Sequence, residues 1–101
     1  DVCRRFMADM ATRVLRITGA LVRGDLRVIE NEAHILRPTS AAVGATVMSD
    51  LCGRLEGAAC AARIEEVGAL VGALREQVGE VERALARELG DQPPGHFAES
   101  P

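Results

Sequence analysis

The sequence predicts an all-α protein, an antiparallel up-down helical bundle, and three observations lead to that prediction. Apolar residues recur at spacings of three and four over most of the chain, which is the period of an amphipathic helix. The connections between these stretches are short, so consecutive helices are expected to be antiparallel neighbours. The sequence also contains no strand signal, no internal repeat and no Gly-rich phosphate loop.

The composition favours a single domain without a nucleic-acid partner. A chain of 101 residues, 48% of them hydrophobic, is long enough to enclose one core. Aromatic residues make up only 2%, so this core must be built mainly from aliphatic side chains and Met. The net charge is -3 and the basic residues are dispersed, which argues against nucleic-acid binding.

The first helix is predicted over residues 2–22. Gly24 suits its C-terminus, and Asp25 is a good N-cap for the helix that follows. The apolar stripe of this first helix consists of Cys3, Phe6, Met10, Val14, Ile17 and Leu21.

The second helix is expected to start after Asp25, to be interrupted at Pro38 and to end at Gly44. A third helix is predicted over 45–57, followed by a short connection over 57–59. The inward residues of these two helices are expected to be Leu26, Ile29, Ala33, Leu36, Met48, Leu51, Cys52 and Leu55.

The fourth helix is the longest, predicted over 61–89, and the bundle as a whole is expected to span residues 1–90. A glycine in a helix interior costs about 1 kcal/mol relative to Ala, so Gly68, Gly72 and Gly79 suggest close approach of a neighbouring helix. The Pro-Pro-Gly sequence after Gly90 ends helical structure, and residues 91–101 are expected to form a disordered tail. The apolar seam of the fourth helix consists of Ile64, Val67, Val71, Leu74, Val78, Val81 and Leu85.

Cys3, Cys52 and Cys60 are expected to be reduced, buried and structurally equivalent to small apolar residues, because they are odd in number and widely spaced. No apolar run approaches the roughly 18 to 20 residues that span a bilayer, and no signal peptide is recognisable. We therefore expect a cytoplasmic location without membrane insertion. Twelve arginines without a lysine, together with abundant Ala and Gly, suggest a GC-rich bacterial genome.

The helical period turns His34 outward. At about 100° per residue, His34 lies roughly 120° from the centre of the buried face that Ile29, Ala33 and Leu36 define. An exposed histidine is in most cases an ordinary surface residue, although its imidazole is available as a nucleophile or proton carrier. Its angular neighbours on this helix are Arg27, Glu30, Arg37, Pro38 and Ala41.

The residues around His34 carry a family resemblance. The stretch Glu32-Ala33-His34-Ile35-Leu36-Arg37-Pro38-Thr39-Ser40-Ala41-Ala42-Val43-Gly44-Ala45 resembles the phosphorylation motif of histidine-phosphotransfer (HPt) domains. The family pattern is Ala-His-x-Leu-Lys-Gly-Ser/Ala-Ser, then three residues, then Gly-Ala. The flanks 6–9, 20–25 and 51–56 are also similar to the family. The resemblance covers residues 1–89, and the family's short N-terminal helix is expected to be truncated here.

This resemblance implies a four-helix bundle that relays a phosphoryl group. By motif position, His34 accepts the group through Nε2 from the aspartyl phosphate of a receiver domain and passes it to another receiver, within a response regulator or a hybrid histidine kinase. Arg37 matches the family's Lys and would stabilise the phosphate charge. The receiver would supply Mg²⁺, so the resemblance implies no bound cofactor and no metal ligands in this chain. It implies a phosphocarrier without kinase activity of its own.

The remaining motif positions imply contacts to the partner or to the phosphate. The receiver is expected to dock on Arg27, Glu30, Asn31, Pro38 and Ala41. The hydroxyls of Thr39 and Ser40 match family positions, and two interpretations stay open: they bond the phosphate, or they satisfy helix backbone next to the proline.

Pro38 departs from the family, which usually has Gly at this position. Proline has no N–H and its ring clashes with the carbonyl four residues earlier, which belongs to His34. A kink or local opening beside His34 is therefore predicted. It marks either a tolerated variant or a weakened phosphotransfer site.

The main alternative is a non-catalytic helical interaction or dimerisation module with a degenerate phosphotransfer site, built on the seam of the fourth helix. Otherwise a monomer is expected. A metal or haem site formed by His34, His96 and cysteines is disfavoured, because these residues share no recognisable ligand spacing.

Overall fold

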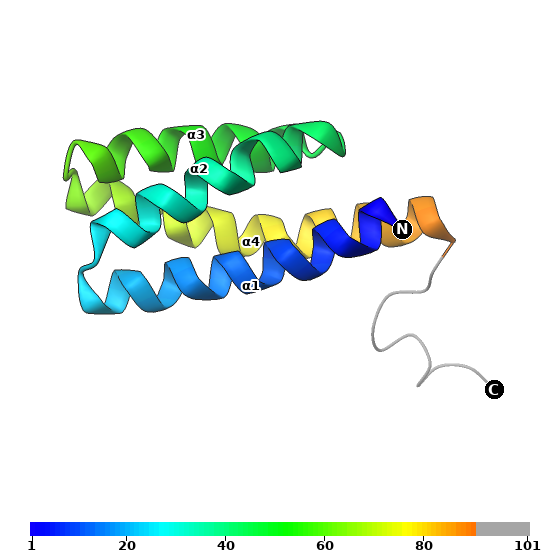
Figure 1. Ribbon diagram of the computed structural model, residues 1–101, viewed down its shortest axis with the longest axis horizontal. Coiled ribbons are helices and arrows are strands. Elements are labelled where there is room, and N and C mark those ends of the chain that lie inside the picture. The colour runs from blue at the N-terminus through cyan, green and yellow to red at the C-terminus, as the bar shows by residue number, and fades with distance from the viewer. Residues whose placement is uncertain (91–101) are drawn as a thin grey trace.

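Four helices joined by short turns make up residues 1–90, the part of the chain that the computed structural model describes (Figure 1). The tail expected over 91–101 lies outside these described residues. The helices are α1 (Val2–Arg23), α2 (Leu26–Ala42), α3 (Thr46–Cys60) and α4 (Ile64–Leu89).

The helices form an up-down bundle closed into a ring. Each helix packs on the next one along the chain, and α4 closes the ring against α1. The most extensive pairing is that of α2 with α3. In Figure 1 the N-terminal part of α1 and the C-terminal part of α4 extend past the turn between α2 and α3. The predicted all-α antiparallel bundle is confirmed.

The turn between α1 and α2 forms as its residue types predict. Gly24 adopts a left-handed backbone with φ 73°, a conformation that favours glycine, and ends α1. The side chain of Asp25 then accepts a hydrogen bond from the backbone N–H of Val28 at 3.3 Å, which caps α2. This turn sets the two helices antiparallel.

The core is aliphatic, with one aromatic ring. The predicted seam of α4 is largely buried, but Ile64 is 58% exposed because it is the first residue of the helix and lies beyond the packed part. Leu70, which lies beside the predicted seam, is buried instead. The buried apolar residues are Phe6, Met10, Val14, Ile17, Ala20, Ile29, Ala33, Leu36, Met48, Cys52, Leu55, Ala58, Ala59, Val67, Leu70, Val71, Leu74, Val81 and Leu85.

The predicted connection over 57–59 is wrong, because α3 continues to Cys60. Ala58 and Ala59 are buried, and their packing outweighs the low helix propensity of Gly57. The turn lies instead at 61–63, where Ala62 adopts a positive φ of 56°.

The expected reason for the glycines of α4 is also wrong. A Cβ at Gly68 or Gly72 would meet nothing within 4 Å, and one at Gly79 would meet only the side chain of Arg83 in the same helix. No neighbouring helix approaches these positions closely, and nothing in the structure explains the glycines.

The three cysteines are free, as expected, but they are not all buried. Cys52 is buried, Cys3 is half-buried and Cys60 is exposed. Cys60 lies on the last turn of α3, where the helix leaves the core. Among the described residues, no helix is both long enough and apolar enough to cross a membrane.

Candidate functional site

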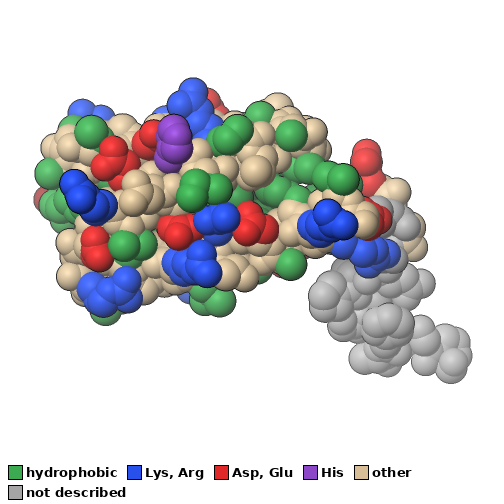
Figure 2. All heavy atoms as spheres, in the orientation of Figure 1, with side chains coloured by type: hydrophobic (Ala, Val, Ile, Leu, Met, Phe, Trp, Pro, Cys, Tyr) green, Lys and Arg blue, Asp and Glu red, His purple; other side chains and the backbone are tan. Residues whose placement is uncertain are grey.

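His34 projects from the middle of α2, and 71% of its side chain is exposed. The preceding residue, Ala33, is completely buried, so the predicted outward orientation of His34 is confirmed. Figure 2 shows a histidine side chain on the surface over α2 and α3, with acidic and arginine side chains next to it. The imidazole is thus open to a partner.

A carboxylate on α3 holds the His34 ring. Glu56 Oε2 lies 2.7 Å from His34 Nδ1, and the Glu56 side chain is only 24% exposed. An ionised carboxylate only accepts hydrogen bonds, so Nδ1 must carry the proton. In the neutral ring the lone pair then lies on Nε2, the nitrogen that faces away from Glu56.

Residues 51–56 are similar to the family in sequence, but Glu56 was not among the site residues predicted from the sequence. One signal was present in the sequence. Glu56 follows the inward residues Cys52 and Leu55 by four and one positions, which places a carboxylate at the edge of the buried face of α3.

Arg37 lies next to the same carboxylate. Its Nη1 is 3.9 Å from Glu56 Oε1, an ion-pair distance that is too long for a hydrogen bond. The Arg37 side chain is 59% exposed. Glu56 Oε1 is itself buried without a hydrogen-bond partner in the described structure. His34 and Arg37 therefore share one carboxylate, and Arg37 keeps its donors for another anion.

The backbone near Pro38 does not open, so the predicted interruption of the second helix is wrong: α2 runs through Pro38 to Ala42. Proline still leaves the His34 carbonyl without its usual donor four residues later. Hydroxyl groups reinforce the helix around this point. Ser49 of α3 donates to the Arg37 carbonyl at 3.0 Å. Burial of Leu36 on the same turn holds the helix on the core.

The two hydroxyls of the motif serve the backbone. Thr39 Oγ1 donates to the Leu36 carbonyl at 3.0 Å, and Ser40 Oγ donates to the same carbonyl at 2.7 Å. Ser40 is completely buried, so its hydroxyl does not reach the surface where His34 lies. Of the two interpretations open for these residues, backbone satisfaction is the one that the geometry supports.

The residues expected at the partner interface share the outer face of α2. Arg27, Asn31, Pro38 and Ala41 are exposed, and Glu30 is half-buried. The apolar side chain of Ile35, which was not among the predicted interface residues, is 42% exposed beside His34 in the chain. This face combines apolar and charged groups, as protein interfaces do.

An ion-pair network fixes α2 against α1 on this side of the bundle. Arg13 of α1 pairs with Asp9 and with Glu32 of α2, each at 2.8 Å, and Arg16 lies 3.6 Å from Glu32. The hydrogen bonds that Arg13 donates to Asp9 and Glu32 raise the pKa of Arg13 above its ordinary value. The network ends two residues before His34 and orients that part of α2.

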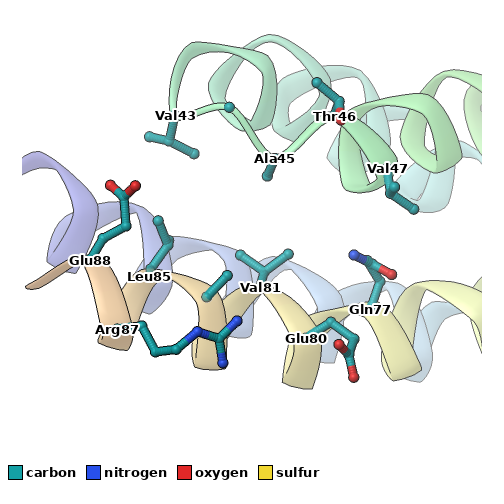
Figure 3. Close-up of a pocket in the computed structure, with 12 residues that line it drawn as sticks. Val43, Ala45, Thr46, Val47, Gln77, Glu80, Val81, Leu85, Arg87 and Glu88 are labelled. Carbon is teal, nitrogen blue, oxygen red and sulfur yellow. The ribbon is translucent and has the colours of Figure 1, made fainter. Parts of the chain in front are cut away.

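A hollow lies away from His34, between the α2–α3 turn and the C-terminal half of α4. Its volume is about 550 Å³, and Figure 3 shows Val81 and Leu85 of α4 pointing toward Val43 and Ala45. None of the site residues predicted from the sequence lines this hollow, so it takes no part in the His34 site.

The Hpt domain family model matches residues 1–91 of the chain. The chain therefore belongs to the Hpt domain family, which serves histidine phosphotransfer in phosphorelays and works with receiver domains. Neither curated proteins nor solved structures give a match.

Proposed function

We propose that His34 is the phospho-acceptor of this Hpt domain, taking a phosphoryl group from the aspartyl phosphate of one receiver domain and passing it to another. The observation that carries this proposal is the 2.7 Å contact between His34 Nδ1 and Glu56 Oε2 on an otherwise exposed ring. The contact leaves the Nε2 lone pair directed away from the protein, so that Nε2 can attack the phosphorus atom of an approaching phosphoryl group.

The chemistry balances with the groups present. Nε2 attacks phosphorus, the bond from phosphorus to the aspartyl oxygen breaks, and the receiver carboxylate leaves with the electron pair. The ring keeps its proton on Nδ1 and becomes a phosphorylated imidazolium, whose positive charge lies against the Glu56 carboxylate. Transfer to the second receiver is the reverse step, with the neutral imidazole as leaving group. Glu56 thus stabilises the carrier state without reacting.

Arg37 supports the proposed transfer by charge. It is three residues from His34 on α2, about one turn away, and it shares the Glu56 carboxylate. Its uncommitted N–H groups can donate to the oxygens of the phosphoryl group, whose charge must be stabilised during transfer.

We assign Mg²⁺ to the acidic pocket of the receiver. Within residues 1–90, no three His, Cys, Asp or Glu side chains gather in a way that could hold a metal ion. The Hpt domain then contributes a nucleophile and positioning, and the partner contributes the divalent cation.

The alternative role as a dimerisation module through the α4 seam has less support. Val67, Val71 and Leu74 are buried in the chain's own bundle, so these residues are not available to a second chain. We therefore place the partner interface on α2 around His34.

The test is phosphoryl transfer from a panel of receiver domains labelled with radioactive acetyl phosphate. Wild type should acquire an acid-labile, base-stable label, His34→Gln should acquire none, and His96→Gln should behave as wild type. Label that persists on His34→Gln, or no label on wild type with any receiver of the panel, would overturn the proposal.

A further inference from the structure

Arg37 reaches its place by crossing α3 at a glycine. A Cβ built on Gly53 would lie 3.3 Å from Arg37 Nε, which is tighter than ordinary van der Waals contact, and 3.4 Å from its Cζ. The Arg37 side chain therefore lies against backbone at this point of α3. Any larger residue at position 53 would have to compete with it for space.

Gly53 belongs to a row of three α3 residues that contact the His34 site. Ser49 donates to the Arg37 carbonyl at 3.0 Å, Gly53 lies under the Arg37 side chain, and Glu56 contacts both His34 and Arg37. Spacings of four and three place the row on one face of α3. The backbone, side chain and charged head of Arg37 each meet one residue of this row.

The three α3 residues position the Arg37 guanidinium without accepting hydrogen bonds from its N–H groups. Within the described residues, none of the side-chain hydrogen bonds uses an N–H of Arg37, and the nearest carboxylate oxygen is 3.9 Å away. Packing against Gly53 is therefore the close contact that directs the side chain toward Glu56. Free donors in a defined position are what recognition of a transferring phosphoryl group requires.

Helix stability gives no reason for a glycine here. Gly53 is in the interior of α3, where glycine costs about 1 kcal/mol relative to Ala. Its backbone is ordinary right-handed helix, because the positive-φ glycines are Gly24, Gly44 and Gly90. A hollow of about 410 Å³ adjoins Gly53 and Arg37, so a larger residue at position 53 can push the Arg37 side chain aside without unfolding the bundle.

We propose that Gly53 is a positioning residue for phosphoryl transfer: by lacking a side chain, it lets Arg37 lie across α3 beside Glu56, next to the His34 ring. This inference rests on the proposed function of His34 and Arg37. Glycine at position 53 thereby favours fast phosphoryl transfer, although its helix propensity is lower than that of Ala.

The test compares Gly53→Ala and Gly53→Leu with Gly57→Ala and Gly57→Leu. Gly57 lies one turn on in the same helix, and a Cβ there would meet nothing within 4 Å, so it is a matched control. All four variants should be at least as stable to urea as wild type, because Ala and Leu are better helix formers than Gly. Gly53→Leu should slow transfer from a labelled receiver about tenfold, because misplacing a catalytic group by ~1 Å can lower a rate on the order of 100-fold. Gly53→Ala should slow transfer about twofold. The Gly57 variants should match wild type.

An Arg37→Ala background separates positioning from a general disturbance of α3. In that background, Gly53→Leu should slow transfer no further, because the group it displaces is gone. Equal rates for Gly53→Leu and Gly57→Leu, or an undiminished effect of Gly53→Leu without Arg37, would overturn the assignment while leaving the role of His34 intact. Absence of label on wild type would instead overturn the proposed function and this inference with it.

Discussion

The His34 ring has two nitrogens, and Glu56 Oε2 lies 2.7 Å from one of them, Nδ1. The helix phase of α2 predicted that His34 points outward, because burial of Ile29 and Leu36 determines the opposite face. The phase of α2 could not predict Glu56, since that residue comes from α3 and meets His34 only when the two helices pack. The same holds for Gly53, whose contact with Arg37 depends on the spacing between α2 and α3.

Substitution of Glu56 should separate orientation of the His34 ring from charge stabilisation. Glu56→Gln retains an oxygen that can accept from Nδ1, so we expect the proton to stay on Nδ1 and transfer to slow by less than about tenfold. Glu56→Ala removes the acceptor, and we expect mixed tautomers and a loss of about 10- to 100-fold.

Nitrogen NMR of the imidazole in a His96→Gln background reads the tautomer of His34 alone, and receiver-dependent labelling gives the rate. A His34 ring that remains protonated on Nδ1 in Glu56→Ala would contradict the role assigned to Glu56.

At the scale of the elements, the helices were predictable where local signals and core periodicity agree. The Gly24–Asp25 turn formed as predicted because glycine favours the left-handed backbone and Asp caps the next helix. Local signals misled where packing opposed them. Gly57 suggested an end to α3 and Pro38 an interruption of α2. Both helices continue, because Ala58 and Ala59 of α3 and Leu36 and Ser40 of α2 are buried.

Replacement of Pro38 tests whether packing maintains α2 against a local penalty. Pro38 is exposed, so Pro38→Ala opens no cavity and restores the donor to the His34 carbonyl. Proline costs ~3 kcal/mol in a helix interior, and its rigidity in the unfolded chain recovers up to ~1 kcal/mol. We expect Pro38→Ala to raise the free energy of unfolding by about 2 kcal/mol, measured by urea denaturation. An unchanged or lower urea midpoint would show that α2 bears no such penalty.

At the scale of the molecule, the ring of four helices is held by an aliphatic core and by the Arg13 network between α1 and α2. The core includes the Cys52 thiol of α3, one turn before Glu56. Burial raises the pKa of the Cys52 thiol to about 12, and the charge of Glu56 acts in the same direction. Folding therefore opposes ionisation of this thiol.

This burial predicts a pH dependence of stability in alkaline solution. In the unfolded chain Cys52 ionises near its ordinary pKa of 9.0, whereas in the folded chain it keeps its proton up to about 12. Between these values the unfolded state binds fewer protons, so the free energy of unfolding falls as pH rises, by up to about 1.4 kcal/mol per pH unit. Urea midpoints measured from neutral to alkaline pH should fall more steeply for wild type than for Cys52→Ala. Parallel pH profiles of the two proteins would contradict the prediction.

By itself, the sequence determined the fold class and the outward direction of His34. It also determined the course of the helices, with most of their ends predicted to within a few residues. These properties follow from residue spacing along one helix and from capping residues, both of which are local. The tertiary structure alone decided the partners of His34 and Arg37 and the contact at Gly53. Each of these depends on the distance and rotation between α2 and α3, which many side chains set together and which no single helix encodes. The site thus consists of His34 and Arg37 on the outer face of α2 and of Gly53 and Glu56 on α3.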